Sequence, residues 1–237
     1  MTCVSIHQPG YIPWLGYFEK IARSDIHVFL DDVQFEKNSF DNRNKIRTRE
    51  GPIWLTVPVM TKGRFGSNRL MDVEIDNHSG WNKKHWKGLE TNYAKAPFFR
   101  NHAPFFEAVY AKEWRLLKDL NMEITVYLLQ ALGIRTRTVF SSQTERKGKK
   151  SDLVLDLCKN LGATTYLSGI LGKDYLALDK FQQANIRVLF QEYEHPVYHQ
   201  QFPGFVPNMS VLDLLFNEGP RSLEILLGKF KMEEKIA

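Results

Sequence analysis

The first thirty residues alternate between short apolar segments and a helical pattern, and this alternation constrains the fold more than any other feature. Thr2–Ile6 is short, apolar and partly β-branched, which predicts a strand. Apolar residues at helical spacing predict a helix from Trp14 to Arg23, and Ile26–Leu30 predicts a second strand. A strand–helix–strand unit normally gives two parallel strands joined by a right-handed crossover. The chain is therefore expected to begin with a parallel sheet.

The same rhythm returns in the second half of the chain. Strands alternating with helices favour an α/β fold, with a mostly parallel Rossmann-like sheet covered by helices on both faces. The predicted strands are Thr136–Phe140, Thr165–Leu167 and Arg187–Phe190. The predicted helices are Ser151–Leu161, Leu178–Ala184, Val211–Phe216 and Ser222–Phe230.

The middle of the chain is less regular. Trp54–Val59 and Asp72–Ile75 are strand-like, and an apolar stripe predicts a helix over Trp114–Leu132. No linker divides the sequence. We therefore expect residues 1–237 to form a single α/β domain, in which residues of about 54–132 are an inserted β/helical segment.

Charge and composition limit the class of partner. The formal net charge is +5 and the pI about 9.1, which favours an anionic small-molecule ligand such as a phosphate or carboxylate. The densest basic segment, Arg146–Lys150, is one loop and not the stripe of a nucleic-acid binder. It precedes a predicted helix, so it either binds an anion there or is an exposed basic loop.

Cysteine usage and hydropathy indicate the compartment. Cys3 and Cys158 lie in apolar segments and are expected to be buried, reduced thiols, with neither a disulfide framework nor a cysteine-rich zinc site. The N-terminus shows no signal peptide, and no run is long and apolar enough to span a membrane. These features predict a cytoplasmic protein. The sequence identifies no cofactor and predicts no metal site.

Polar side chains follow every predicted parallel strand. In an open parallel sheet, ligands bind beyond the carboxyl ends of the strands, so these side chains are expected to share one edge. They are His7 and Gln8, then Asp31, Asp32 and Gln34, then Ser141 and Ser142, then Ser168, Gly169, Gly172 and Lys173, and finally Gln191, Glu192 and His195.

His7 and Asp32 are the candidate catalytic residues. A histidine between a strand and a Pro/Gly turn can act as acid or base, or bind a phosphate near the following helix; alternatively, its ring only hydrogen-bonds the turn. Gln8 adds a second hydrogen-bonding group. Neighbouring residues of a strand point to opposite sides, so one of Asp31 and Asp32 is expected to face the site. We choose Asp32, with Asp31 capping or solvated.

The segment after Asp32 supplies candidate substrate-binding residues: Gln34, Lys37, Asn42, Arg43 and Asn44. Arg43 could form a forked pair with a carboxylate or phosphate, although this segment could equally be a solvated loop.

Later in the chain the candidate substrate-binding residues are Ser168, Gly169, Lys173, His195 and Tyr198. Gly169–Lys173 lacks the full phosphate-loop pattern and is also compatible with a simple strand-to-helix turn. His195 and His199 have the spacing of zinc ligands, but Pro196 prevents a regular helix between them.

Several blocks resemble the WbqC-like family in order, from about residue 5 to 219. The opening block is His7–Phe18, and Gly10 stands in it where many relatives carry Asn. The others are Asp31–Phe35, Asn42–Asn44, Trp54–Val59, Tyr166–Gly169, His195–Gln200 and Ser210–Asn217. The resemblance implies a bacterial, cytosolic protein associated with O-antigen or other surface-polysaccharide clusters. It assigns no mechanism.

Three functions are compatible with these features. The first is a transferase that modifies a nucleotide-linked sugar by acyl or aminoacyl transfer, with His7 or Asp32 as base. The second is an adenylate-forming ligase or nucleotidyltransferase. The third is a non-catalytic binding module of a biosynthetic complex, which predicts exposed apolar patches.

Overall fold

The N-terminal strand–helix–strand unit forms as predicted. In the computed structural model, which describes residues 1–36, 38–60, 68–228 and 232–233, β1 (Cys3–His7) pairs in parallel with β2 (Ile26–Phe29). The helix α1 (Leu15–Ala22) connects them. Side chains alternate across a strand, so Ser5 and His7 share one face of the sheet and Val4 and Ile6 the other.

Three further parallel strands extend the sheet. They are β5 (Arg137–Phe140), β6 (Thr165–Ser168) and β7 (Arg187–Gln191), and the short β8 (Met232–Glu233) is antiparallel to β7. The spatial order is β5-β2-β1-β6-β7-β8. This confirms the α/β fold with a mostly parallel sheet.

The direction of the connections reverses between β1 and β6. From β1 the chain builds outward through β2 to β5, and it then returns to the other side of β1 to form β6 and β7. Such a reversal is the topological switch point of a doubly wound sheet, outside which ligands bind.

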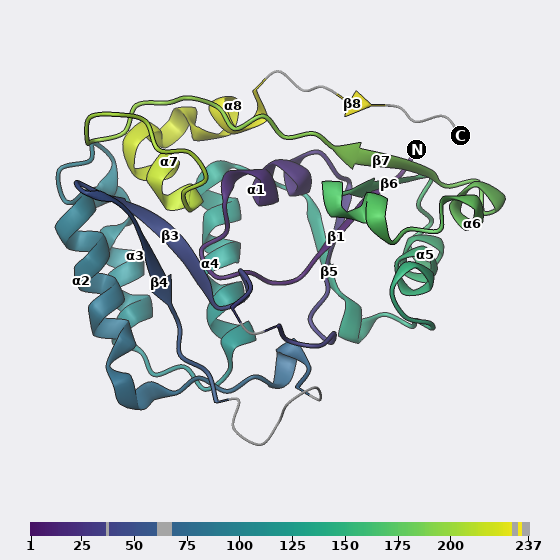
Figure 1. The fold of residues 1–237 in the computed structure, drawn as a ribbon, viewed down its shortest axis with the longest axis horizontal. Coiled ribbons are helices and arrows are strands. Elements are labelled where there is room, and N and C mark those ends of the chain that lie inside the picture. Colours follow the sequence, from purple (N-terminus) through teal and green to yellow (C-terminus); the bar gives the residue numbers. More distant parts are fainter. Residues whose placement is uncertain (37, 61–67, 229–231, 234–237) are drawn as a thin grey trace.

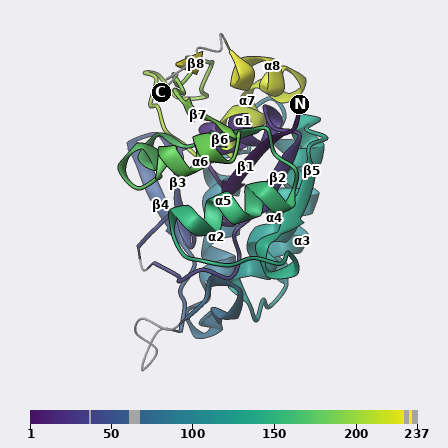
Figure 2. The ribbon, with the colours of Figure 1, turned by 90° about the vertical axis from the view of Figure 1, so that its right-hand side faces the viewer.

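Helices cover both faces of the sheet. Figure 1 shows α5 (Ser151–Asn160) and α6 (Leu178–Gln183) on its right, and Figure 2 shows the same two helices lying in front of the strands. The opposite face carries α1, α4 (Leu117–Leu132), α7 (Val211–Glu218) and α8 (Ser222–Leu227). Accordingly, Val4, Ile6 and Val28 pack in a cluster with α5 and α6, whereas Phe29 packs in the larger cluster with α1 and α4.

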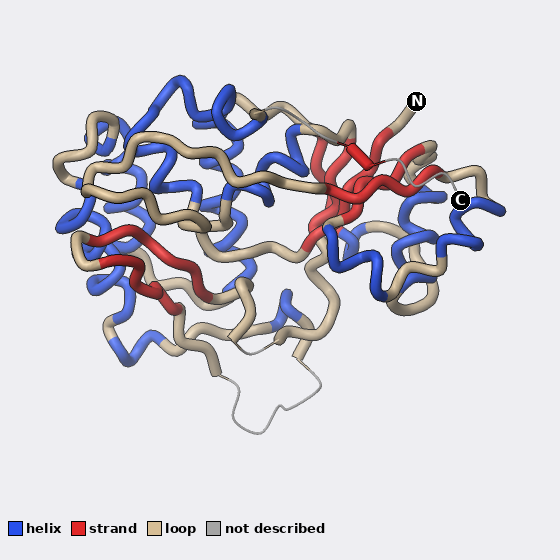
Figure 3. Tube along the Cα trace, turned by 45° about the horizontal axis from the view of Figure 1, so that its top comes forward, coloured by secondary structure: helices blue, strands red, loops and turns tan. Residues whose placement is uncertain are grey.

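The middle segment differs from the sequence expectation in its strands. An antiparallel hairpin of β3 (Arg43–Thr48) and β4 (Gly51–Thr56) lies apart from the main sheet (Figure 3). The sequence analysis did not predict β3. Its alternate buried positions are Asn44 and Ile46, and a polar residue at one of them hides the apolar alternation that indicates a strand. The predicted strand over Trp54–Val59 begins earlier, at Gly51, and ends at Thr56.

The predicted strand over Asp72–Ile75 is wrong. Ile75 bridges to Val59 while Glu74 bridges to Leu116, so neighbouring residues pair with different segments and no ladder forms. The bridge between Glu74 and Leu116 also explains why α4 begins at Leu117 and not at Trp114 as predicted. Leu117 donates its backbone N–H to the carbonyl oxygen of Val73, so the preceding residues pair with this segment. The short 3₁₀ helices are η1 (Leu70–Asp72), η2 (Asn77–Ser79), η3 (Ser141–Gln143), η4 (Ile170–Asp174) and η5 (Gly219–Arg221).

Two further helices, α2 (Trp81–Tyr93) and α3 (Phe99–Ala111), complete the middle segment. Their buried side chains pack in one cluster with those of α1, α4 and α7. The division of the chain into domains stays a prediction, although this shared cluster is the packing expected of a single domain with an insertion. Within the described ranges, no helix has the length and hydropathy needed to cross a bilayer.

Candidate functional site

The five parallel strands end at one edge of the sheet. Backbone pairing sets His7 opposite Phe29, Phe29 opposite Phe140, and Ser168 opposite Phe190. The polar residues that follow these strands therefore begin at the same edge. His7 and Ser168 end the two strands at the switch point, β1 and β6.

His7 is exposed to solvent at the end of β1. Its Nδ1 lies 3.1 Å from the carbonyl oxygen of Gln8, and its ring makes an edge contact with Tyr17 at 5.0 Å between centroids. A carbonyl oxygen only accepts, so Nδ1 carries the proton and Nε2 keeps a free lone pair. The hydrogen bond predicted by the turn alternative is thus present, and it leaves His7 in the tautomer that a general base needs.

The surroundings favour the neutral form of His7. Desolvation by the surrounding protein and the nearby Lys20 ammonium lower the pKa of His7, against the hydrogen bond to Gln8, which raises it. Water reaches the exposed ring, and this moderates the effect of desolvation without changing its direction. His7 is therefore neutral at pH 7.

Beneath His7 the sheet face toward α1 is polar. The Ser5 hydroxyl lies 2.7 Å from both the Ser24 hydroxyl and Nδ1 of His27. Ser24 donates to the carbonyl oxygen of Ile21 at 2.9 Å, so its oxygen is left to accept from Ser5, and Ser5 in turn accepts from His27. Nε2 of the fully buried His27 has no hydrogen-bond partner in the described residues.

Lys20 is a functional candidate that the sequence analysis missed. Its side chain comes from α1 and is only 3% exposed, and Nζ donates to the carbonyl oxygen of Ile6 at 3.1 Å. Burial lowers the pKa of Lys20 to about 7, while the neighbouring Glu19 raises it. The sequence of α1 gives no signal of this burial, because Lys20 follows Glu19 and the pair resembles the solvated side of an amphipathic helix.

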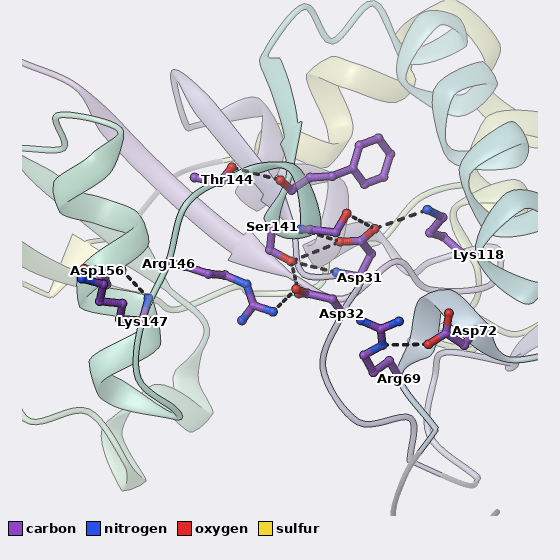
Figure 4. Close-up of polar contacts among 12 residues, drawn as sticks. Asp31, Asp32, Arg69, Asp72, Lys118, Ser141, Thr144, Arg146, Lys147 and Asp156 are labelled. Atoms are coloured by element: carbon purple, nitrogen blue, oxygen red, sulfur yellow. Dashed lines mark hydrogen bonds and ion pairs between the residues drawn. The ribbon is translucent and has the colours of Figure 1, made fainter.

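Asp31 and Asp32 form a hydrogen-bonded cluster with the start of η3 (Figure 4). Asp31 is fully buried and accepts from the Ser142 backbone N–H at 3.0 Å and from the Ser142 hydroxyl at 2.8 Å. Lys118 of α4 lies 3.4 Å from the same carboxylate. Asp31 thus ties the end of β2 to the end of β5.

Asp32 stands beside this cluster and is already engaged. The Ser141 hydroxyl donates to it at 2.6 Å, and Arg146 forms an ion pair with its other oxygen (Figure 4). A carboxylate held by both partners has few lone pairs left to accept a substrate proton. The basic loop therefore contributes at least Arg146 to this edge, and His7 is the better placed base.

Asn42 and Asn44 anchor backbone segments around the turn after β1. Asn42 is buried and donates to the carbonyl oxygen of Val57 at 2.8 Å. Asn44 donates to that of Ile12 at 2.9 Å. On α4, Asn121 donates to the carbonyl oxygens of Pro9, at 3.0 Å, and Asp41, at 2.7 Å. These amides position the turn.

Arg43 lies on the solvent side of the hairpin. Its guanidinium stacks on the exposed Trp54 at 4.5 Å from the ring centroid, and Lys45 lies 5.5 Å from the same ring. Phe40 is also exposed, 5.9 Å from Trp54. Its carbonyl oxygen accepts from the Tyr11 backbone N–H at 3.0 Å, so this cationic and aromatic surface adjoins the turn that begins at His7.

The remaining predicted residues lie in varied settings. Gln34 is exposed, and Lys37 lies outside the described residues. Ser168 is buried, with its hydroxyl donating to the Gly169 carbonyl oxygen at 3.0 Å. Lys173 lies 3.4 Å from Glu192. Gly172 is required for packing, since a Cβ there would meet the Ser168 hydroxyl at 2.0 Å.

Tyr198 and His195 belong to a different environment. The Tyr198 hydroxyl donates to Asp213 of α7 at 2.9 Å, and Asp213 also accepts from Tyr93 at 2.9 Å and Gln200 at 2.7 Å. His195 is half-buried and packs on Tyr198 at 6.1 Å. This network, which we call the Asp213 network, joins α2, α7 and residues 198–200 and engages the Tyr198 hydroxyl, whereas His195 lies beside it.

An open surface depression lies elsewhere, between α5 and α6. Lys147, Asp152, Asp156 and Lys180 line it. Lys180 pairs with Asp152 at 2.7 Å, and Asp156 accepts from the Lys147 backbone N–H at 2.6 Å, so both carboxylates of the depression have partners within the chain. We place the candidate site at the switch point because buried, incompletely paired polar groups gather there. Across the described ranges, no three His, Cys, Asp or Glu side chains gather as metal ligands do.

The chain thus forms a doubly wound α/β sheet with polar groups at its switch point, the edge at which folds of this class bind ligands. The profile of the WbqC-like protein family matches residues 8–225, so the chain belongs to this family. It is 38% identical over 228 residues to the uncharacterized protein Rv1507c of Mycobacterium tuberculosis strain H37Rv, covering 95% of this chain and 98% of that protein. No solved structure gives a match.

Proposed function

We propose that this protein is a cytosolic enzyme of bacterial surface-polysaccharide biosynthesis that transfers an acyl or aminoacyl group to a nucleotide-linked sugar. The observation that carries the proposal is His7, which is neutral, accessible and fixed in one tautomer at the switch point. The association with surface polysaccharides comes from the family resemblance.

His7 would act as the general base. Its Nε2 takes a proton from the amino or hydroxyl group of the sugar as that group attacks the acyl carbon, and the protonated ring returns the proton to the leaving group. A neutral imidazole at pH 7 is ready for the first step. The Arg43–Trp54 surface beside the turn would hold the nucleoside part of the sugar nucleotide, because a guanidinium and an aromatic ring both stack on a base.

The strand order supports a second candidate, an adenylate-forming ligase or nucleotidyltransferase. Renumbered along the sheet, β5-β2-β1-β6-β7 is the 3-2-1-4-5 order of dinucleotide-binding folds. This activity would consume ATP and release pyrophosphate, whereas simple transfer from an activated donor releases none.

Mass spectrometry can test both candidates on the same reactions. Purified protein is incubated with UDP- and dTDP-linked amino sugars and with activated acyl or aminoacyl donors, with and without ATP, while pyrophosphate is measured. We expect a sugar nucleotide that gains the mass of the acyl group without ATP. Pyrophosphate release that depends on ATP would instead establish the second candidate.

Variants test the assigned residues. His7→Gln and Arg43→Ala should fold normally, with turnover lost in the first and sugar-nucleotide affinity lost in the second. The exposed His78 of η2 provides the matched control, His78→Gln. Full turnover and affinity in both site variants would show that the active site lies elsewhere.

A further inference from the structure

The position of Lys20 in α1 does not explain why a lysine is buried there. A buried ammonium costs several kcal/mol unless it is paired. Within the described part of the chain, Lys20 has one hydrogen bond, to the carbonyl oxygen of Ile6, although an ammonium has three protons to donate. The adjacent Glu19 carboxylate is engaged by other groups, Arg23 and Gln191. A helix packed on a sheet has no structural need for such a lysine.

The ammonium of Lys20 lies at the switch point itself. It contacts the carbonyl oxygen of Ile6 near the end of β1, and an added Cβ on Gly169, directly after β6, would lie 3.9 Å from Nζ. Both His7 and His27 are near enough for the Lys20 charge to affect their protonation. Lys20 therefore lies between the ends of the two strands where a doubly wound sheet binds its ligand.

Gly169 leaves the approach to this ammonium open. The residue is partly exposed and has ordinary extended backbone angles, φ −70° and ψ 163°, so glycine is not required there for conformational reasons. An alanine would fit at normal contact distance, but a larger side chain would lie over Nζ. Gly169 thus leaves Nζ uncovered by any side chain of its own, and this is the side from which we infer that a ligand would reach the otherwise enclosed group.

We propose that Lys20 binds the diphosphate of a nucleotide-linked substrate at the β1/β6 switch point, with Gly169 as the open side of the site. This inference deepens the proposed function and rests on it for the nature of the substrate. A dianionic phosphate supplies the missing partner for the ammonium, and the neighbouring neutral histidines add no competing negative charge. The backbone at Gly169 allows the phosphate to approach closely.

The chemistry of Lys20 provides a specific signature of binding. With a pKa of about 7, Lys20 is about nine-tenths neutral at pH 8, and a bound phosphate would raise that pKa. Binding of a fully ionised diphosphate such as that of UDP at pH 8 should therefore take up nearly one proton. Among the described residues, His7, His27 and Glu19 interact electrostatically with Lys20, and none of them is removed in the variants below.

Calorimetry with pyrophosphate and UDP, in buffers of different ionisation enthalpy, measures both affinity and proton uptake. We expect Lys20→Met to weaken binding of both probes at least tenfold and to abolish the proton uptake. Gly169→Leu should weaken binding similarly without removing the lysine, and Gly169→Ala should not. Lys180→Met is the matched control, because this lysine is exposed and paired with Asp152.

The outcomes separate the two proposals. Wild-type protein that binds neither probe at millimolar concentration, or a Lys20→Met variant with unchanged affinity and proton uptake, would overturn the Lys20 site. Loss of binding in Lys180→Met alone would move the anion to the α5/α6 depression and also overturn it. If no sugar nucleotide is modified but both probes bind with proton uptake that depends on Lys20, the transferase proposal fails and the Lys20 site stands.

Discussion

Replacing Lys20 by methionine should make the protein more stable at neutral pH, and the gain should shrink as the pH rises. Methionine has a similar length and no charge. Burial lowers the pKa of Lys20 from 10.5 to about 7, so folding disfavours its charged form. Each pKa unit corresponds to about 1.4 kcal/mol, which gives about 5 kcal/mol for the full difference.

The sign and pH window follow from linkage. Between pH 7 and 10.5 the unfolded chain holds the Lys20 proton and the folded chain has released it, so the stability of the wild type rises with pH. The cost of the lysine is about 4 kcal/mol at pH 7 and about 2 kcal/mol at pH 9. The stability advantage of Lys20→Met should therefore fall by about 2 kcal/mol between these two pH values.

Urea unfolding of both proteins at pH 7, 8 and 9 measures this change. The comparison cancels every group that the two proteins share, and the packing of the methionine adds a constant that does not depend on pH. Lys180→Met should show no comparable slope, since that lysine is exposed. A difference between wild type and Lys20→Met that stays constant within 0.5 kcal/mol, on the order of the uncertainty of urea extrapolation, would refute the reasoning.

Three other substitutions or reactions test other parts of the fold. Asp213→Asn replaces the acceptor of the Asp213 network and should lower the free energy of unfolding by about 2–4 kcal/mol in urea titrations; a loss below 1 kcal/mol, on the order of one hydrogen bond, would contradict that role. Burial raises the pKa of Cys3 to about 11 and of Cys158 to about 12, so iodoacetamide at pH 8 should label both only after unfolding, as mass spectrometry can check. Gly133→Ala should cost about 1 kcal/mol in thermal or urea unfolding, because the C-cap of α4 has φ 75°, whereas Gly133→Asn should cost less.

Hydrophobic periodicity predicted the sheet and most helices, because burial against a parallel sheet leaves a strong local pattern. The hairpin did not show this pattern. In β3 the buried positions are filled by Asn44 and Arg47 as well as Ile46. Asn44 donates to the carbonyl oxygen of Ile12 and Arg47 to that of Pro203, and both acceptors are distant in sequence. Such long-range partners are not visible in a short stretch of sequence, so the local pattern of β3 indicates a polar loop.

The candidate site shows the same limit. The rule that polar residues follow parallel strands located His7 and Asp32 at the sheet edge. It could not show that Arg146, more than a hundred residues away in sequence, forms an ion pair with Asp32. It also could not find Lys20, because a lysine in an amphipathic helix is usually solvated. Only the packing of α1 on the sheet reveals that this lysine is buried.

The two hydrogen bonds donated by the Asn121 amide limit how far the protein could be shortened by engineering. The amide of Asn121 reaches from α4, inside the middle segment, to the turn after β1, at Pro9, and to the backbone just before β3, at Asp41. A shortened protein that lacks residues 54–132 would therefore keep His7 but lose the Asn121 hydrogen bonds that hold the turn after β1. The apparent insertion is a working part of the N-terminal edge, and the smallest unit that preserves this edge includes it.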